Sequence, residues 1–562
     1  MIQMRANVNT VAKQTANSNE THLALKWKEI DWKTAEAFVS KIQTRIAKAS
    51  VRGNARLVRE LQRMLKHSFY AKLLAVKKVI SNKGGKTPGV DGVVWKTPSQ
   101  RYQAALTMET KGYKPMPLRR VYIKKANGKK RPLGIPTLYD RAIQCIEAMA
   151  LDPAIESKSD ITSFGFRKGR SCADAMQQTF QVLSKRNSAS WVLEGDIKAC
   201  FDEISHEWLQ ENVEMSKATL SQILKSGYME KKTWFPTTSG TPQGGIISPI
   251  LANQALNGLD PLLKNAFRLQ RPTKTRTYYN PKVNLVRYAD DFIITAADRE
   301  TAEQAKETVK RFISERGLQL SDEKTLITEI HQGFDLLGWN IRKYSNEKLL
   351  IKPSQKSMQK AVNQFRDIIH RHQGASQDVL IAKLNPVITG WSNYHQSAVA
   401  RKAFEKLDHV LFQMLWKWAV KRHSNKGTRW IKKKYWKTEG TRNWVFKGET
   451  KRLRKMSDLK IVRHPTLNLS KNPYIDADYF VSRKLKIESN KLTGRAKRIW
   501  LKQKGLCPEC KSMMDKMEER KMYNITKAEP YGEAELIFIH KQCAVTYAES
   551  VAGMASIKPC FL

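Results

Sequence analysis

Two adjacent aspartates, Asp290 and Asp291, stand within an apolar stretch, NLVRYADDFIIT. Like charges repel, and aspartate favours neither helix nor strand. The apolar flanks predict the two strands of a hairpin with Ala289-Asp290 at its turn, which would expose both carboxylates at the rim of a sheet. Carboxylate oxygens are ligands that Mg²⁺ prefers, so a metal ion between them would relieve the repulsion.

A third carboxylate belongs to a second stretch, WVLEGDIKACFDEI. Its run WVL predicts a strand that ends at Asp196. If this strand lies beside the hairpin, the three carboxylates converge. Three carboxylates can hold two metal ions about 3.5–4 Å apart, the arrangement for in-line phosphoryl transfer. A single YADD also occurs by chance in ordinary chains, so the tetrapeptide alone does not establish such a site.

The charge of the chain indicates a polyanionic partner. Its 562 residues include 100 Lys plus Arg against 52 Asp plus Glu, a formal net charge of +48. Such a chain repels itself unless a polyanion neutralises it, and nucleic acid is the natural candidate. Solubility alone is the weaker explanation, because acidic residues solubilise better than basic ones. An anionic membrane surface is the other alternative, but we find neither a lipidation signal nor an apolar run of about 18 residues.

The elements that must position these carboxylates follow an α+β pattern over residues 115–345, where short β-like runs alternate with helical runs. RRVYIKKANGKKRPLGIP predicts a hairpin with Asn127-Gly128 at its turn. A helix is expected to begin after Asp298 as N-cap and to stop at Gly317. The length of the chain predicts several domains.

Basic helices are expected on both sides of this region. Residues 22–80 predict amphipathic helices whose Lys- and Arg-rich faces suit RNA or DNA, although a plain solvated face would have the same pattern. A helical domain follows from residue 353. Residues 420–500 mix basic and aromatic residues, which suits phosphate contact together with base stacking. The apolar stripes behind these expectations are Leu57, Leu61 and Leu65; Met358, Val362, Phe365 and Ile369; and Leu407, Leu411, Met414 and Trp418.

Eight motifs, taken in order, resemble those of the reverse transcriptase/maturase family encoded by group II introns. The resemblance covers roughly residues 22–550. The motifs are TPGVDG (87–92), IKKANGKKRPLGIPTLYDRAIQ (123–144), SFGFRKGRS (163–171), EGDIKACFDEI (194–204), TPQGGIISPILANQAL (241–256), RYADDF (287–292), GLQLSDEKT (317–325) and FDLLGWNIRKY (334–344).

The resemblance implies an α+β multidomain fold, a right-hand polymerase with fingers, a palm built on an antiparallel sheet and a helical thumb. It also implies a basic DNA-binding segment and a small Cys/His module. The expected divisions are a disordered tail (1–20), an N-terminal basic helical extension (21–86), fingers and palm (87–350), domain X, which is the thumb (351–440), a DNA-binding domain (441–500) and a degenerate HNH endonuclease-like module (501–562).

The resemblance also assigns roles to single residues. Asp196, Asp290 and Asp291 would be the catalytic trio that holds two Mg²⁺ ions, with the backbone carbonyl of Ile197 as a further ligand. The roles next to the incoming nucleotide are then as follows: Phe201 lies under the sugar and excludes a 2′-hydroxyl, Lys125 and Arg131 clamp the triphosphate, and Gln243 contacts the nucleotide. Asp202 is not among the family's metal ligands.

The function implied is RNA-directed DNA synthesis combined with a maturase role in splicing and a role in intron mobility. The partners would be intron RNA, an RNA template with a DNA primer, target DNA and deoxynucleoside triphosphates, with no membrane. The expected location is the cytoplasm of a bacterium, associated with intron RNA and the nucleoid, or an organellar matrix. A non-enzymatic RNA-binding maturase is the alternative, against which the intact pair Asp290-Asp291 argues. A polymerase acting on another template is the third reading.

The C-terminal module departs from the family pattern. Cys507-x-x-Cys510 and His540-x-x-Cys543 have a spacing that suits zinc, although a metal-free tail remains an alternative. The family's HNH site carries a His-His pair where this chain has YNIT (523–526), and Glu535 stands in place of the Asn. Since HNH chemistry needs a histidine base and further metal ligands, we expect DNA cleavage to be lost or weak. The other cysteines are scattered and indicate a reducing compartment.

Overall fold

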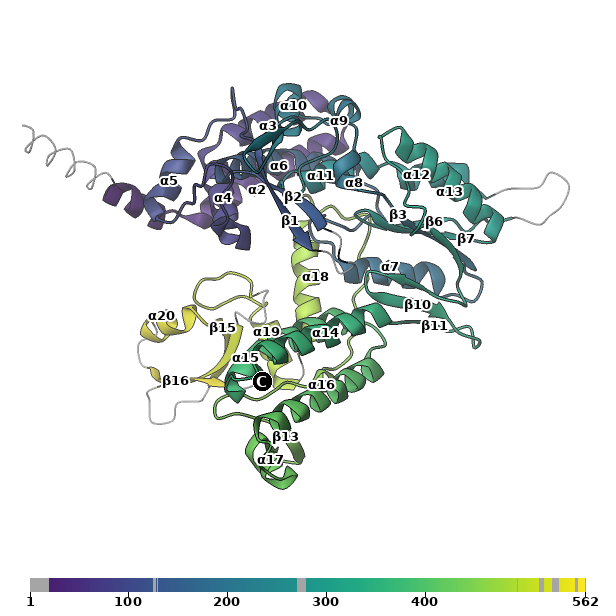
Figure 1. The fold of residues 1–562 in the computed structure, drawn as a ribbon. Helices are drawn as coiled ribbons and strands as arrows, with labels where there is room; N and C mark the ends of the chain where they lie inside the picture. The colour runs from purple at the N-terminus through teal and green to yellow at the C-terminus, as the bar shows by residue number, and fades with distance from the viewer. Residues whose placement is uncertain are drawn as a thin grey trace, which may run out of the picture. The chain divides into compact units, whose positions relative to one another are not determined.

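The computed structural model describes residues 20–560 except 125–127, 129, 270–278, 493, 515–519, 528–534 and 551–553 (Figure 1). The tail expected over residues 1–20 lies outside this range apart from Glu20. The chain forms two compact units: unit 1 is Met1–Ile330 with Asn468–Asp476, and unit 2 is His331–Leu467 with Ala477–Leu562. The division after residue 330 falls earlier in the chain than the boundary expected at 350.

Three helices near the N-terminus confirm the amphipathic pattern predicted for residues 22–80. Asp31 and Asn54 cap the first two of them through side-chain oxygens that accept backbone N–H groups. Leu61 and Leu65 are fully buried, and they pack with Ala150 and the rest of a small core. The helices are α2 (Trp32–Val51), α3 (Ala55–His67) and α4 (Phe69–Ser81), and they contact the long helix α6 (Leu138–Lys158).

The predicted hairpin of basic strands is present as β1 (Leu118–Lys124) and β2 (Lys130–Ile135). The strands pair antiparallel from Arg119↔Ile135 to Lys124↔Lys130. Most of the turn, including Asn127, lies outside the described residues. β4 (Tyr228–Glu230) and β5 (Thr233–Phe235) extend the sheet in the order β2-β1-β4-β5.

A second sheet of unit 1, antiparallel throughout, brings together the strands and the turn that carry the three aspartates. Its order is β6-β7-β3-β8, and its strands are β6 (Asn284–Tyr288), β7 (Asp291–Ala296), β3 (Trp191–Asp196) and β8 (Leu326–Glu329). Helix α13 (Arg299–Ser314) packs on β3 and β7. Asp298 caps it as predicted, but the helix ends three residues before Gly317, whose φ of +74° reverses the chain.

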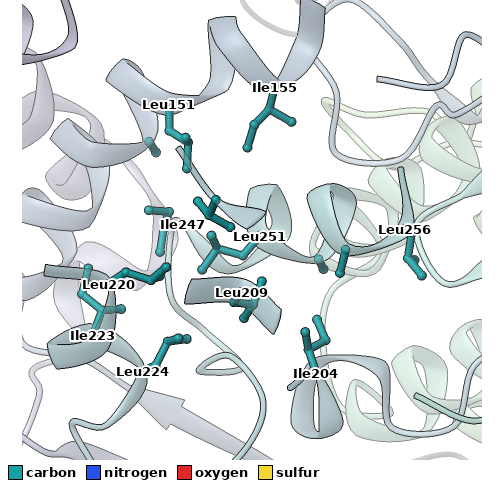
Figure 2. Close-up of a cluster of buried hydrophobic side chains, with 14 of the residues drawn as sticks. Leu151, Ile155, Ile204, Leu209, Leu220, Ile223, Leu224, Ile247, Leu251 and Leu256 are labelled. Carbon is teal, nitrogen blue, oxygen red and sulfur yellow. The ribbon is translucent and has the colours of Figure 1, made fainter. Parts of the chain in front are cut away.

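Shorter helices enclose the core of unit 1, part of which Figure 2 shows. Leucine and isoleucine side chains from α6, α9, α10 and α11 meet there, and this packing holds the four helices together. The helices are α5 (Pro98–Leu106), α7 (Cys172–Leu183), α8 (Cys200–Glu203), α9 (His206–Asn212), α10 (Lys217–Leu224), α11 (Ser248–Leu256) and α12 (Leu259–Ala266).

One short segment, Asn468–Asp476, belongs to unit 1 although the sequence on both sides of it belongs to unit 2. Its Tyr474 hydroxyl donates a hydrogen bond to the buried carboxylate of Asp152 on α6. Thr44 of α2 donates to the Tyr474 carbonyl at 2.8 Å. The Lys168 ammonium lies 4.3 Å from the centroid of the tyrosine ring. These contacts fasten the segment to α2 and α6.

Unit 2 is built on a helical core. The two stripes predicted after residue 353 are confirmed, since Phe365, Leu407, Leu411 and Trp418 are buried in one cluster. The elements are β9 (Phe334–Leu336), β10 (Trp339–Lys343), β11 (Leu349–Pro353), α14 (Gln355–Arg371), α15 (Gln377–His395), α16 (Arg401–Arg422), α17 (Thr428–Tyr435), β12 (Trp436–Glu439), β13 (Arg442–Phe446), α18 (Ala477–Asn490), α19 (Gly494–Lys502), β14 (Arg520–Lys527), β15 (Glu535–His540), α20 (Cys543–Ser550) and β16 (Met554–Cys560).

The expectation that the aromatic residues after 420 serve base stacking is wrong for several of them. Tyr435, Trp436 and Phe446 are buried in the core of unit 2. A two-stranded hairpin such as β12–β13 is not stable alone, so it packs its aromatic face against the helices. This hairpin also spans the domain boundary expected at residue 440. Within the described ranges, every helix is too short or too polar to span a lipid bilayer.

Candidate active site and metal centre

The turn of the predicted aspartate hairpin has the expected position, with Ala289 and Asp290 between β6 and β7. Ala289 adopts a φ of +58°, in the left-handed region that favours glycine. A Cβ atom on Gly165 would lie 2.3 Å from the Ala289 backbone nitrogen. Only glycine therefore allows the segment around residue 165 to support this turn from below.

The third aspartate lies directly across from the pair. β3 and β7 pair antiparallel with Asp196 opposite Asp291, and the preceding pair is Gly195 with Phe292. A Cβ atom on Gly195 would lie 2.1 Å from the Phe292 ring, so only glycine at this position leaves room for the ring. The sequence placed all three carboxylates at neighbouring strand ends, and the register of the sheet confirms that they lie together.

The carboxylates of this site destabilise one another. Part of Asp291 is open to solvent, but loss of hydration on its other sides raises its pKa to about 6, and the charges of Asp290 and Asp196 add to the effect. Burial is also the main cause that raises the pKa of Asp290, followed by repulsion from Asp196. Oxygen donors under such mutual repulsion fit a hard divalent cation such as Mg²⁺.

Lys324, to which no role was assigned from the sequence, supplies a positive charge beside the three carboxylates. The Lys324 Nζ donates to Asp196 Oδ2 at 2.6 Å. Its hydrogen bond with Asp196 is the main cause that raises the pKa of Lys324, and its charge lowers the pKa of Asp290 and Asp291. Lys324 stands in the GLQLSDEKT motif, but the sequence could not distinguish it from the many other cations.

A fully buried arginine holds the hairpin from its inner side. The guanidinium of Arg287 donates to Asn253 Oδ1, to Asn257 Oδ1 and to the Ala289 carbonyl, each at 3.3 Å. Asn253 in turn donates to the carbonyl of Gly165 at 2.9 Å. The arginine thus links α11, the segment around Gly165 and the aspartate turn. This role could not be predicted from the sequence, because arginine is rarely buried.

Three of the residues expected near a nucleotide, Phe201, Gln243 and Arg131, have side chains in the described part of the chain. Phe201 is half-buried and meets Phe166 edge to face, with ring centroids 6.2 Å apart. Gln243 Nε2 donates to Asp202 Oδ2 at 2.6 Å, so Asp202 makes a polar contact with this glutamine. Burial raises the pKa of Asp202, while the Gln243 hydrogen bond and the charges of Arg120 and Arg131 oppose this.

Arg131 is an exposed residue of β2, and its charge also reaches Asp290. Ile197 follows Asp196 and pairs through its backbone with Leu320. Lys125 lies outside the described residues. The turn around Gln243 approaches β2 closely, since the Gln243 carbonyl accepts the Gly134 N–H at 2.9 Å.

A second cluster of potential metal ligands lies in unit 2. Cys507, Cys510, His540 and Cys543 bring their ligand atoms within 4.8 Å of one another. The spacing therefore correctly placed these four side chains together. Three sulfurs and one imidazole nitrogen match a structural tetrahedral zinc centre, whose Zn–S bonds are about 2.3 Å long. The positions that replace the family's His-His pair lie on β14, where Tyr523 pairs with Ile537 of β15.

Family models match three parts of this chain. The model described as reverse transcriptase (RNA-dependent DNA polymerase) matches residues 123–341. The N-terminal domain of reverse transcriptase matches residues 27–108. The maturase-specific domain of group II introns matches residues 356–436. These matches include both the aspartate site and the helices α14 to α16.

Several curated proteins are similar to the chain. Protein YkfC of Escherichia coli (strain K12) is 33% identical over 346 residues, which cover 55% of this chain and 89% of that protein. The group II intron-encoded protein LtrA of Lactococcus lactis subsp. cremoris is 34% identical over 328 residues, which cover 48% of this chain and 54% of LtrA. Maturase-like protein 1 of Euglena gracilis is 24% identical over 377 residues, which cover 65% of this chain and 76% of that protein.

The chain therefore spans about half the length of LtrA. Among solved structures, telomerase from Candida albicans in complex with a fragment of telomeric RNA is similar with a TM-score of 0.31 and 11% identity, covering 63% of this chain and 68% of that one. A likeness this low carries no conclusion about fold or function.

Proposed function

Because the chain belongs to the family of reverse transcriptases and maturases encoded by group II introns, we propose that it copies RNA into DNA and also assists the splicing of its intron. The observation that carries the polymerase proposal is the register of β3 and β7, which sets Asp196 opposite Asp291 and next to Asp290. Three carboxylates at one sheet rim suit the two-metal arrangement of phosphoryl transfer.

In this proposal Asp196, Asp290 and Asp291 hold two Mg²⁺ ions, with the Ile197 carbonyl as a further ligand. The ions would supply charge neutralisation at the attacked phosphate and activation of the primer 3′-hydroxyl. Lys324 keeps the carboxylates in place before a nucleotide arrives, because it offsets part of their repulsion. Arg287 and Gly165 fix the turn that presents Asp290.

The remaining residues of the site orient the nucleotide. Arg131 on β2, together with Lys125, holds the triphosphate as cations on the fingers hairpin. Phe201 lies under the sugar, where an aromatic ring leaves no room for a 2′-hydroxyl and so selects deoxynucleotides. Gln243 contacts the nucleotide once its hydrogen bond to Asp202 is broken. If that hydrogen bond persists, Gln243 instead holds the segment that carries Phe201 and Asp202.

The maturase role belongs to the chain's RNA-binding surface, since the splicing chemistry is that of the intron RNA. Residues 351–440 would grip template–primer and intron RNA, the basic helices α2 to α4 would contact intron RNA, and residues 441–500 would contact target DNA. The net charge of +48 supports a polyanionic partner of large size.

We further propose that Cys507, Cys510, His540 and Cys543 bind one structural zinc ion, and that the C-terminal module cleaves DNA weakly or not at all. The four ligands use all positions of a tetrahedral site, so no position is left for a water nucleophile. Efficient strand cleavage of target DNA by the protein–intron complex would contradict the second part of this proposal.

Primer extension tests the polymerase proposal. The reaction contains an RNA template, a DNA primer, deoxynucleoside triphosphates and Mg²⁺, with wild type beside Asp290→Asn. We expect DNA synthesis by the wild type and a loss of at least about a hundredfold in the variant, since a metal contributes several kcal/mol and each 1.36 kcal/mol is tenfold. Retained RNA binding by both proteins with no synthesis by either would reject the polymerase and leave an RNA-binding maturase.

A further inference from the structure

A groove of about 520 Å³ runs between α14 and α16 of unit 2. Figure 1 shows the two helices beside each other. Three residues of α14 line it with the spacing i, i+3 and i+4, together with one residue of the turn that follows this helix. Five residues of α16 line it with the spacing i, i+3, i+4, i+7 and i+8, so each set covers one helix face. The lining residues are Arg366, Ile369 and His370 of α14, Gln373 of the turn after it, and Met414, Lys417, Trp418, Lys421 and Arg422 of α16.

The floor of the α14–α16 groove is apolar. Ile369 and Met414 are half-buried there, and Trp418 is 5% exposed. The indole N–H of Trp418 is buried and has no hydrogen-bond partner in the part of the chain that the structure describes. The floor of the groove therefore consists of an indole ring, an isoleucine and a methionine side chain.

The rim of the groove is cationic. Arg366, Lys417 and Lys421 are exposed, and every ionisable side chain among the described lining residues is a lysine, an arginine or a histidine. Arg422 closes one end, because its guanidinium donates to the carbonyls of Gln373 at 3.0 Å, Gly374 at 3.3 Å and Ala375 at 2.6 Å. These carbonyls lie in the turn that follows α14, so Arg422 ties the end of α16 to this turn.

We propose that the α14–α16 groove binds one unpaired nucleotide of the RNA, with its base on the apolar floor and its flanking phosphates on the rim. The inference rests on the proposed RNA-binding function and names where a single-stranded position is held. Cations around an apolar floor are the arrangement that single-stranded nucleic acid requires, and a base inside a duplex could not enter. The volume lies in the range of pockets for small ligands. An apolar peptide would need no cationic rim.

The test measures binding of the full chain to labelled RNA pentamers by fluorescence anisotropy at about 0.2 M salt. One probe is penta-adenosine, and the other has the same backbone with its central base removed. We expect the wild type to prefer the complete probe by about fivefold or more, as stacking of one base provides. Met414→Gln places an amide on the floor and should abolish the preference. Val420→Gln, an exposed position of α16 outside the groove, is the matched control and should keep it.

A cross-link locates the base independently of any variant. A pentamer with 5-iodouridine at its centre is irradiated with the wild type, and the adduct is mapped by mass spectrometry to peptides of α14 or α16.

An adduct that maps only elsewhere, or a base preference that Met414→Gln leaves unchanged, overturns the groove assignment. Equal binding of both probes overturns it while RNA binding itself stands. Failure to bind either pentamer and folded intron RNA refutes the proposed RNA-binding function as well. Stronger cross-linking of a DNA pentamer with 5-iodo-2′-deoxyuridine at its centre would assign the groove to DNA instead.

Discussion

The ammonium of Lys324 and the carboxylate of Asp196 form an ion pair at 2.6 Å across 128 positions of sequence. Asp196 faces Asp291 in the sheet, and Lys324 comes just before β8, the strand on the other side of β3. The lysine therefore occupies part of the coordination capacity of a carboxylate that the proposed chemistry needs for metal ions.

Replacing Lys324 with Gln should tighten Mg²⁺ binding in the absence of nucleotide. The freed carboxylate oxygen becomes available, and one positive charge near the site is removed. We expect the Mg²⁺ concentration at half-maximal thermal shift to fall severalfold, while the metal-free variant loses no more than about 1 kcal/mol because the lysine is largely exposed. Lys324→Arg keeps the charge and serves as control. An unchanged half-maximal concentration would show that the pair does not compete with metal.

Replacing Gly165 with Ala should impair catalysis more than folding. The added methyl would meet the Ala289 nitrogen at 2.3 Å and push the turn that carries Asp290. A displacement of about 1 Å at a reacting group costs around a hundredfold in rate, so single-turnover primer extension should slow by that order. Gly427→Ala, where the new methyl meets open space, is the matched control. Normal extension by the Gly165 variant would mean that the turn relaxes without consequence.

Replacing Phe201 with Val should relax sugar selection. The smaller side chain leaves space beneath the sugar, so incorporation of ribonucleotides relative to deoxynucleotides should rise by about tenfold or more, since the bulk of a side chain in a pocket discriminates by about 1–3 kcal/mol. Phe201→Tyr retains the ring and should retain the selection. The measurement is competitive single-nucleotide extension, and equal ratios in all three proteins would remove Phe201 from this role.

The buried His395 should make unit 2 less stable in mild acid. Burial lowers the pKa of His395 from 6.5 to about 4, and its Nδ1 has no partner within the described residues. Between pH 6.5 and 4, His395 binds a proton in the unfolded chain but stays neutral in the folded chain. Stability is thus full above pH 6.5 and falls as the pH drops toward 4, by up to about 3 kcal/mol.

Hydrogen exchange of peptides from α14 and α15 at pH 7 and pH 5 measures this loss within unit 2. His395→Gln should be less stable than the wild type at pH 7 but should show a smaller further loss at pH 5. Parallel behaviour of both proteins would assign the acid sensitivity to other groups.

Removing zinc should unfold the C-terminal module and leave the polymerase site intact. Metal binding and folding are coupled in small sites of this kind, so a strong chelator or Cys507→Ser should expose β15 to proteolysis. Elemental analysis should find one zinc per chain in the wild type and in Cys172→Ser, a cysteine of unit 1 outside the cluster. Less than stoichiometric zinc in the wild type would reject the site.

The parts of the site that the sequence predicted are those fixed by local pattern. Asp290 at a turn and Asp196 at a strand end follow from apolar runs of strand length, because side chains alternate along a strand. The zinc ligands follow from spacing in the same way. Lys324 could not be predicted, since its role depends on a long-range contact and it is one of 100 cations.

The burial of individual side chains is the property that could be predicted least well from the sequence. Arg287 is a charged residue in the core, and its partner Asn253 on α11 comes from another motif. Trp436 and Phe446 lie in a basic segment, yet tertiary packing places them inside unit 2. Aromatic residues serve equally as core and as stacking surface, so only the fold decides between the two.

The segment Asn468–Asp476 has a consequence for how the gene can be cut. Leu467 follows the helices α14 to α17 and the hairpin β12–β13, so a truncation after it would be taken to remove only accessory sequence. It would also delete Tyr474 and with it the partner of Asp152 on α6. Unit 1 is therefore encoded in two separate stretches of the gene, and a stop codon placed after Leu467 would leave it incomplete.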